Sequence, residues 1–217
     1  MIITPIKTRV LLPPKDNLLE AIKEAVPKIK ERSIVAITSK VISIWQGRCI
    51  AISKVNDKNE LIKQESDYYL PRNFTPHGWA MHTLKNNLLI PSAGIDESNG
   101  NGYYILWPKN PVAAAKKIGQ FLQKTYRIKN VGVVITDSHS IPLRRGVVGI
   151  SLGAWGFNPL NDYRGTPDIF GRTFHFSQTN IPDALAAATV FAMGEGSEQT
   201  PIAVISSMFL FALSMQR

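Results

Sequence analysis

Three runs of consecutive apolar residues constrain the fold of this chain more than any other feature. They cover residues 34–38, 131–136 and 202–206, and each has the length of one strand. A continuous apolar run of this length is typical of a strand that is covered on both faces. Residues 147–152 and 103–107 predict further strands.

Helical periodicity lies around these runs. From residue 16 to residue 32 apolar side chains recur with helical spacing, and Asn17 followed by Glu20 is a polar start signal. Pro27 predicts that this helix is kinked or shortened. Residues 111–126 predict a second helix, with a proline in its first turn and apolar side chains on one side.

An alanine-rich stretch, residues 182–193, predicts a third helix that ends at Gly194. Strands and helices together predict a mixed α/β fold. No internal repeat, low-complexity tract or linker divides the sequence, so we expect a single domain over residues 1–217. A chain of 217 residues with 44% hydrophobic content can build the core of one such domain.

Charge and cysteine content limit the partners and the compartment. The formal net charge of +9 favours anionic partners such as nucleotides, nucleic acids or carboxylates, without choosing among them. Cys49 is the only cysteine and the N-terminus has no secretion-signal pattern, so we expect a cytoplasmic protein. Residues 202–215 are apolar but shorter than the roughly 20 residues that cross a bilayer. We expect them to form a buried strand and a packed terminal segment. Residues 53–87 are mostly polar and give no chemical signature.

Two short stretches suggest a site for a metal ion and a nucleotide. In each, an apolar run ends at an acidic residue with a hydroxyl or amide nearby: Asp96 before Asn99, and Asp137 before Ser138. Such oxygens at the edge of a sheet suit a hard cation. Taken singly, both aspartates could instead cap turns, because Asp after a strand commonly bonds to its own backbone. The sequence has neither the common glycine-rich nucleotide loops nor a zinc-ligand pattern.

Six segments, in order, resemble one known family. They are Ser92-Ala-Gly-Ile-Asp-Glu-Ser-Asn99, Ile135-Thr-Asp-Ser138, Arg145-Gly-Val-Val-Gly149, Asp162-Tyr-Arg-Gly165, Asp168-Ile-Phe-Gly-Arg172 and Met193-Gly-Glu-Gly196. Over residues 35–206 the chain resembles the coenzyme F420-0:gamma-glutamyl ligase family, and is most similar to its folate-metabolism gamma-glutamate ligase branch. The resemblance implies that family's α/β fold and a homodimer formed by extensive intertwining.

The activity that the resemblance implies is GTP-dependent ligation of L-glutamate to a small carboxylate acceptor, either deazaflavin (F420-0) or folate-like. Because a carboxylate is a poor electrophile, GTP would first convert it to an acyl phosphate, which the glutamate amine then attacks. Mg²⁺ or Mn²⁺ would neutralise phosphate charge. Neither nucleic acid nor a membrane is an expected partner.

The resemblance also implies roles for individual residues. Asp96 and Asp137 are the catalytic ligands of one metal ion, while Ser138 and Glu195 serve a second. Residues 9–12 occupy a nucleotide-binding stretch without reproducing its sequence. The other implied nucleotide contacts are Ser39, Lys40, Asn99, Met193, Gly194, Glu195, Gly196 and Ser197.

This sequence departs from the family pattern at several places besides the weakly matching residues 9–12. Ser138 stands where threonine is common, which keeps the hydroxyl. Ile44 replaces a basic residue, which predicts weaker GTP binding or a relaxed preference between GTP and ATP. An Ile44→Lys variant should tighten nucleotide binding if the pocket keeps the family's shape. Ser140-Ile141 replaces the usual Gly-Arg, although Arg144 and Arg145 lie close by. These two arginines and Arg172 could hold anionic groups, or could be solvated or structural.

Two other functions remain open from the sequence. A non-catalytic anion-binding or RNA-binding protein on the same scaffold would also explain the positive charge. RNA modules usually interleave aromatic and basic residues, a pattern that this sequence lacks. A metal-dependent GTP hydrolase that omits the glutamate step is the third possibility. GTP turnover with and without L-glutamate distinguishes the three.

Overall fold

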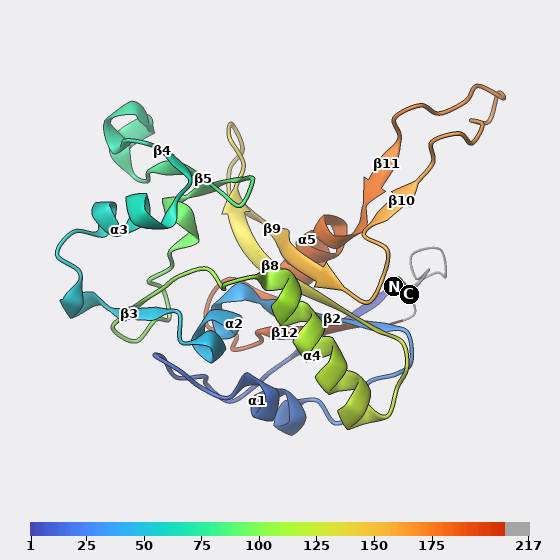
Figure 1. Cartoon of the computed structure of the whole chain (residues 1–217), viewed down its shortest axis with the longest axis horizontal. Coiled ribbons are helices and arrows are strands. Elements are labelled where there is room, and N and C mark those ends of the chain that lie inside the picture. Colours follow the sequence, from blue (N-terminus) through green and yellow to red (C-terminus); the bar gives the residue numbers. More distant parts are fainter. Residues whose placement is uncertain (207–217) are drawn as a thin grey trace.

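A five-stranded mixed sheet forms the centre of the computed structural model, which describes residues 1–206 (Figure 1). The strands lie in the order β1 (Ile2–Ile6), β12 (Ile202–Ser206), β2 (Ser33–Thr38), β8 (Val131–Ser140) and β9 (Val147–Trp155). β2 and β8 are parallel, whereas the other neighbouring strands are antiparallel. The three apolar runs therefore form the three central strands of the sheet.

Helices cover both faces of this sheet, which explains why its central strands are apolar without alternation. α1 (Leu18–Ala25), α2 (Ser39–Gln46) and α4 (Pro111–Tyr126) cover one face, and α5 (Ile181–Met193) covers the other (Figure 1). In β2, Val35 and Ile37 pack with the first group of helices, whereas Ile34 and Ala36 pack with α5. The prediction of a mixed α/β fold is confirmed.

α5 lies so close to β9 that a side chain has no room at Gly149. A Cβ atom at this position would lie 2.3 Å from the carbonyl oxygen of Ala186. Close packing of helix on strand therefore explains this glycine of the 145–149 segment.

A smaller region, residues 49–107, contains short elements only. β3 (Cys49–Ala51) pairs with β7 (Tyr103–Ile105), and three further strands form a small antiparallel sheet in chain order. The further elements of this region are α3 (Lys58–Glu65), β4 (Tyr68–Leu70), β5 (His82–Lys85), β6 (Leu88–Pro91), η1 (Ile52–Lys54), η2 (Arg72–Phe74), η3 (Pro76–Gly78) and η4 (Ser92–Gly94). Elements this short give no sustained apolar period, which is why residues 53–87 yielded no prediction.

An arm extends from the opposite side of the central sheet (Figure 1). It begins and ends with the paired strands β10 (Leu160–Asp162) and β11 (Gln178–Asn180). Ile169, Phe170 and Phe176 on this arm are 90%, 88% and 92% exposed. Three large apolar side chains therefore face solvent on one extended segment.

Some predicted boundaries differ from those of the structure. α1 ends at Ala25, so Pro27 marks a shortened helix, and β7 ends at Ile105 rather than at residue 107. β8 continues to Ser140, which makes the prediction that the strand ends before Asp137 wrong. Pairing with β9 extends this strand, since Asp137 lies opposite Ile150 in the ladder.

The C-terminal prediction can be compared with the structure only in part. Residues 202–206 form the expected buried strand, whereas the expected terminal segment lies outside the described residues. Within residues 1–206, every helix is too short or too polar to cross a membrane.

Candidate functional site

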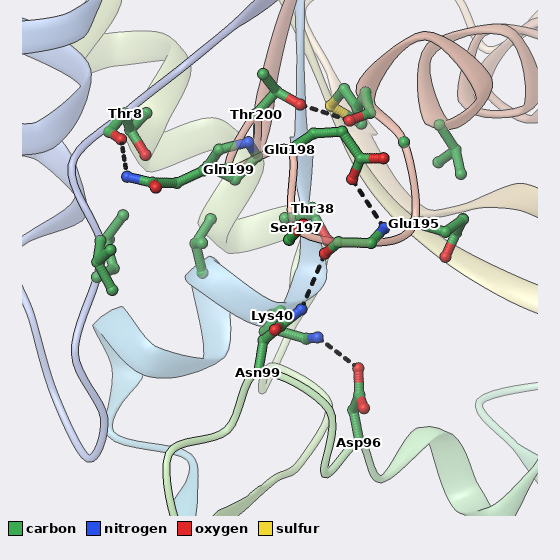
Figure 2. A pocket seen from close by; sticks show the side chains of 18 of the residues that line it. Thr8, Thr38, Lys40, Asp96, Asn99, Glu195, Ser197, Glu198, Gln199 and Thr200 are labelled. Atoms are coloured by element: carbon green, nitrogen blue, oxygen red, sulfur yellow. Dashed lines mark hydrogen bonds and ion pairs between the residues drawn. The ribbon is translucent and has the colours of Figure 1, made fainter.

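A cavity of about 370 Å³ lies at the edge of the sheet where β2 and the first part of β12 meet (Figure 2). Its walls come from residues 8–11, from the β2–α2 junction, from Asp96 and Asn99, from Asp137 and Ser138, and from residues 193–201. The volume is that of a site for a small ligand.

The sheet topology explains why these distant segments meet. β2 and β8 are parallel, so their carboxyl ends lie at one edge of the sheet. β12 runs antiparallel to β2, and its start therefore reaches the same edge. The amide of Thr38 donates to the carbonyl of Pro201 over 3.0 Å, which joins the two strands at the cavity.

Lys40 and Asp96 form an ion pair inside the cavity (Figure 2). Lys40 lies in the first turn of α2, and its Nζ atom is 2.7 Å from Oδ2 of Asp96. The amide and the hydroxyl of Ser98 each donate to Oδ1 of Asp96 over 2.8 Å. Burial opposes ionisation of Asp96, but Lys40 and Ser98 outweigh it and hold the pKa of this carboxyl below its usual range.

Asp137 is the second carboxylate of the cavity, and it has a different environment. It follows an irregularity in the β8–β9 pairing between Ile135 and Thr136. Burial raises its pKa to about 6, against hydrogen bonds from the Trp107 indole, the Ser138 amide and the Ser39 side chain. The charge of Asp96 adds to the rise. The two aspartates are therefore close enough to interact electrostatically.

The loop after α5 forms the opposite wall. Gly194 ends the helix, as predicted, with its amide donating to the carbonyl of Val190. The Glu198 carboxylate accepts from the amide of Gly196 over 2.8 Å. The side-chain amide of Asn99 donates to the carbonyl of Gly196 over 3.1 Å (Figure 2). Asn99 thus ties the Asp96 loop to the loop at the end of α5.

The donor atoms of this cavity fit a nucleotide-bound magnesium or manganese ion. Asp96, Asp137, Ser138 and Glu195 all line it, and all four present oxygen. Within residues 1–206, no cluster of three or more His, Cys, Asp or Glu side chains could hold a metal ion by itself. Mg²⁺ is usually held by one or two carboxylates together with nucleotide phosphates and water, so a pair of aspartates is sufficient. The metal assignment remains a prediction.

Most of the residues predicted to bind nucleotide lie in the cavity wall. Lys40, Asn99 and residues 193–197 line it, and so do Arg9, Val10 and Leu11 of the weakly matching N-terminal stretch. Ser39 differs, because it is buried behind the wall and supports Asp137 instead.

Ile44 lines the cavity but also belongs to the main hydrophobic core, and it is only 3% exposed. A lysine at this position would bring an ammonium group into that core, at a cost in stability. We therefore expect Ile44→Lys to destabilise the fold, and this replaces the sequence-based expectation of tighter nucleotide binding.

The three arginines proposed as anion contacts lie outside the cavity wall. Arg144 and Arg145 are exposed on the loop between β8 and β9. Arg172 is exposed on the arm, where its amide donates to the Asp168 side chain. The structure therefore leaves their solvated or structural interpretation open and brings none of them to the cavity of this chain.

Sequence reasoning missed Thr8, Gln199 and Trp107. The side chain of Gln199 donates to the carbonyl of Thr8 over 2.6 Å, and both residues line the cavity. Their proximity follows from the pairing of β1 with β12, which no local pattern reveals. The sequence around Trp107 predicts only an apolar strand residue, so nothing in it indicates a contact with Asp137.

The chain is similar to acid–amino-acid ligases, the class of enzyme that joins an amino acid to a carboxylate. The family model described as F420-0:Gamma-glutamyl ligase matches residues 5–207. The chain therefore belongs to the F420-0:gamma-glutamyl ligase family. This confirms the prediction of a gamma-glutamyl ligase enzyme.

Individual relatives agree with this assignment. The chain is 28% identical over 223 residues to the coenzyme F420:L-glutamate ligase of Methanopyrus kandleri, covering 95% of this chain and 86% of that protein. It is 36% identical over 195 residues to the coenzyme F420:L-glutamate ligase of Methanococcus maripaludis, covering 82% and 76%. The protein of the same name from Methanocaldococcus jannaschii is 38% identical over 121 residues, which cover 56% of this chain and 48% of that protein.

Proposed function

We propose that this enzyme uses GTP and a divalent metal ion to join L-glutamate to a carboxylate of a deazaflavin acceptor of the F420-0 type. The observation that carries the proposal is the meeting of Lys40, Asp96, Asp137, Asn99 and the 193–197 loop in one cavity. The names of the relatives, coenzyme F420:L-glutamate ligases, favour a deazaflavin acceptor over a folate-like one.

The cavity residues have distinct roles in this proposal. Asp96 and Asp137 would hold one ion, and Ser138 and Glu195 a second. The bound Mg²⁺ or Mn²⁺ would neutralise the charge of the phosphates. Lys40, now paired with Asp96, would bind phosphate oxygens with its three donors. Asn99 and the 193–197 loop would hold the rest of the nucleotide.

The proposed reaction has two steps. An oxygen of the acceptor carboxylate attacks the γ-phosphorus of GTP, which releases GDP and leaves an acyl phosphate. The neutral amine of L-glutamate then attacks the acyl carbon. The C–O bond to phosphate breaks, the nitrogen loses a proton, and an amide and inorganic phosphate result. The cavity's contribution is to hold the reacting groups together and to place cationic groups near the transferred phosphoryl group.

We also propose a homodimer in which the arm is covered by a second copy. Ile169, Phe170 and Phe176 expose almost their whole side chains on it. Large exposed apolar patches mark interaction sites on soluble proteins. The intertwined dimer implied by the family resemblance would bury these residues.

Isotope transfer tests the proposed chemistry. Acceptor labelled with ¹⁸O in its carboxylate is incubated with GTP, Mn²⁺ and L-glutamate, and the phosphate product is analysed by mass spectrometry. Transfer of one ¹⁸O atom to phosphate, together with a product heavier by one glutamyl residue, is expected.

The two alternatives give different results in the same assay. GTP hydrolysis that neither requires L-glutamate nor moves ¹⁸O into phosphate would identify a hydrolase. Binding of GTP or RNA without turnover of any acceptor would identify a binding protein. Replacing GTP by ATP in parallel reactions determines the nucleotide preference.

A further inference from the structure

Trp107 does not line the cavity, but it contacts Asp137, which does. It follows β7, is 3% exposed and lies outside the cavity wall. Its indole Nε1–H donates a hydrogen bond to Oδ2 of Asp137. The one polar group of this buried aromatic side chain, its N–H, therefore points at the Asp137 carboxylate of the site.

The short segment that carries Trp107 also fixes Asp96. The amide of Asp96 donates to the carbonyl of Ile105 over 2.9 Å, and the amide of Ile105 donates back to the carbonyl of Asp96 over 2.8 Å. Asp96 and Asp137 lie far apart in the sequence. Both are nevertheless bonded to residues 105–107, through the backbone in one case and through the indole in the other.

Gly94 sets the contact between the Asp96 loop and the indole. A Cβ atom at Gly94 would lie 2.1 Å from Nε1 of Trp107, so only glycine lets the backbone approach this closely. Its φ of +67° is also a conformation that glycine adopts without strain. The loop therefore packs directly on the indole edge and restricts the direction in which the N–H can point.

A charged cluster also contacts Trp107. Nε of Arg48 donates to the carbonyl of Trp107 over 3.2 Å. Arg48 and Lys85 both pair with Oε2 of Glu65, at 2.7 and 2.8 Å, and the Lys85 ammonium lies 5.8 Å from the centre of the indole ring. The indole is thus held by backbone, glycine and charge contacts, which prevent it from turning away from Asp137.

We propose that Trp107 is a positioning residue of the metal site: its indole N–H fixes the orientation of the Asp137 carboxylate, and its segment sets the spacing between Asp137 and Asp96. This inference rests on the proposed function, because it assumes that the two aspartates hold a metal ion. Hydrogen bonds to metal-binding carboxylates orient them in this way in many metal sites.

Metal affinity is the first test, with no turnover required. Trp107→Phe keeps most of the ring and removes the N–H group. Binding of Mn²⁺ in the presence of GTP is measured from the electron paramagnetic resonance signal of free Mn²⁺. We expect the dissociation constant to rise about 10–100-fold, as for the loss of other hydrogen-bond partners of metal ligands. Trp155→Phe is the matched control, because that ring contacts Gly119 of α4 rather than a carboxylate, and its affinity should not change.

Nuclear magnetic resonance of the indole N–H groups gives a second test that a purely structural role would not affect. The chain has four tryptophans, and single Trp45→Phe, Trp79→Phe and Trp155→Phe variants identify three of the signals, so the remaining signal belongs to Trp107. Addition of Mg²⁺ and GTP to the wild-type protein should shift this signal, and Asp137→Asn should shift it as well. This measurement in the wild-type protein remains decisive if Trp107→Phe does not fold.

The outcomes separate this inference from the proposed function. If Asp137→Asn loses Mn²⁺ while Trp107→Phe keeps wild-type affinity, the positioning role is wrong and the metal site stands. If the wild-type protein binds Mg²⁺ but the Trp107 indole signal does not shift, the positioning role is also wrong. If Asp137→Asn binds Mn²⁺ as well as the wild-type protein does, the metal assignment itself fails.

Discussion

The cavity and the β10–β11 arm both contain segments that match the family, but the bonds of their charged residues differ. In the cavity, Lys40 bonds to Asp96 and Asn99 bonds to Gly196, so each pair joins segments distant in sequence. On the arm, Arg164 pairs with Asp162 two residues away.

Asp168 on the arm likewise accepts from nearby backbone, at Phe170 and Arg172. Local bonds of this kind shape a turn, whereas long-range bonds bring separate groups to one place. In this chain, the matching motifs with distant partners lie at the cavity, whereas those with local partners alone shape turns of the arm.

The largest expected effect distinguishes aspartates of the two regions. Asp137→Asn and Asp96→Asn each remove one charge from the cavity. If these residues hold the metal ion, kcat/KM and metal-dependent GTP affinity should fall about 100-fold or more, because the ion contributes several kcal/mol. Steady-state kinetics and titration calorimetry measure both quantities.

Asp168→Asn is the control for these variants. Its side chain accepts from two backbone amides of the arm, a role that an asparagine oxygen can partly keep. Activity should stay within about threefold of wild type, in line with a loss of well under 1.4 kcal/mol. Wild-type GTP binding by both cavity variants would show that Asp96 and Asp137 are structural, and the contrast between cavity and arm would then fail.

The next effect concerns two lysines that lie near each other in the fold. Lys40→Met should weaken GTP binding about 10–100-fold, because hydrogen bonds to charged groups contribute about 1.5–3 kcal/mol. Lys58→Met is the matched control, since Lys58 pairs with Glu97 over 2.8 Å and does not line the cavity. Equal GTP affinities of the two variants, measured by calorimetry, would contradict the role of Lys40.

Local sequence pattern predicted the core of the fold well. The apolar runs at β2, β8 and β12 needed no knowledge of their neighbours, because burial on both faces makes each strand apolar throughout. The polar end of β8 was not predicted, because it depends on a neighbouring strand. Asp137 is in a strand because β9 pairs with it, and pairing is not visible in the residues of one strand.

The candidate site was predictable where acidic residues end apolar runs and where motifs resemble the family. Asp96 and Asp137 were found in the first way and Lys40 in the second. Thr8 and Gln199 were not found, because strand order alone brings them together. Ile44 shows the limit of motif comparison, since the missing basic residue is replaced by a core side chain rather than by an empty position.

A smaller effect is expected on the arm. Phe170→Asp should raise the dimer dissociation constant at least about tenfold, because burial of a phenylalanine contributes about 1.5–3 kcal/mol. The fold of the single chain should be kept, since Phe170 is 88% exposed in one chain. Sedimentation equilibrium measures the dimer.

Trp79→Asp provides the matched control for the arm. Trp79 is also highly exposed, but it directly follows η3 in the region of β4 and β5, at the opposite end of the molecule (Figure 1). Its replacement should leave the dimer intact. Loss of the dimer in Trp79→Asp but not in Phe170→Asp would move the interface away from the arm.

The smallest effect compares two carboxylates whose pKa values are both lowered. The hydrogen bond from Arg164 lowers the pKa of Asp162 to about 2, on the exposed arm. Burial opposes ionisation of Glu65, but Lys85 and Arg48 outweigh it and lower the pKa of this group as well. Lowered pKa values in the folded state mean that ionised carboxylates stabilise the fold above their unfolded pKa, and that this contribution is lost as pH falls through the folded pKa.

Water and salt screen the exposed pair, so only Glu65 should affect stability measurably. At pH 7 Glu65→Gln should lower the melting temperature, because Lys85 and Arg48 lose their shared partner. The difference from wild type should shrink as pH falls below about 4.3, the ordinary pKa of a glutamate, because the unfolded chain then takes up a proton. It should disappear only below the lowered pKa of folded Glu65, where the wild-type side chain is neutral too. Asp162→Asn should follow the wild-type curve at every pH. A pH-independent difference for Glu65→Gln would mean that the loss arises from packing, and the charged support behind Trp107 would then contribute little to stability.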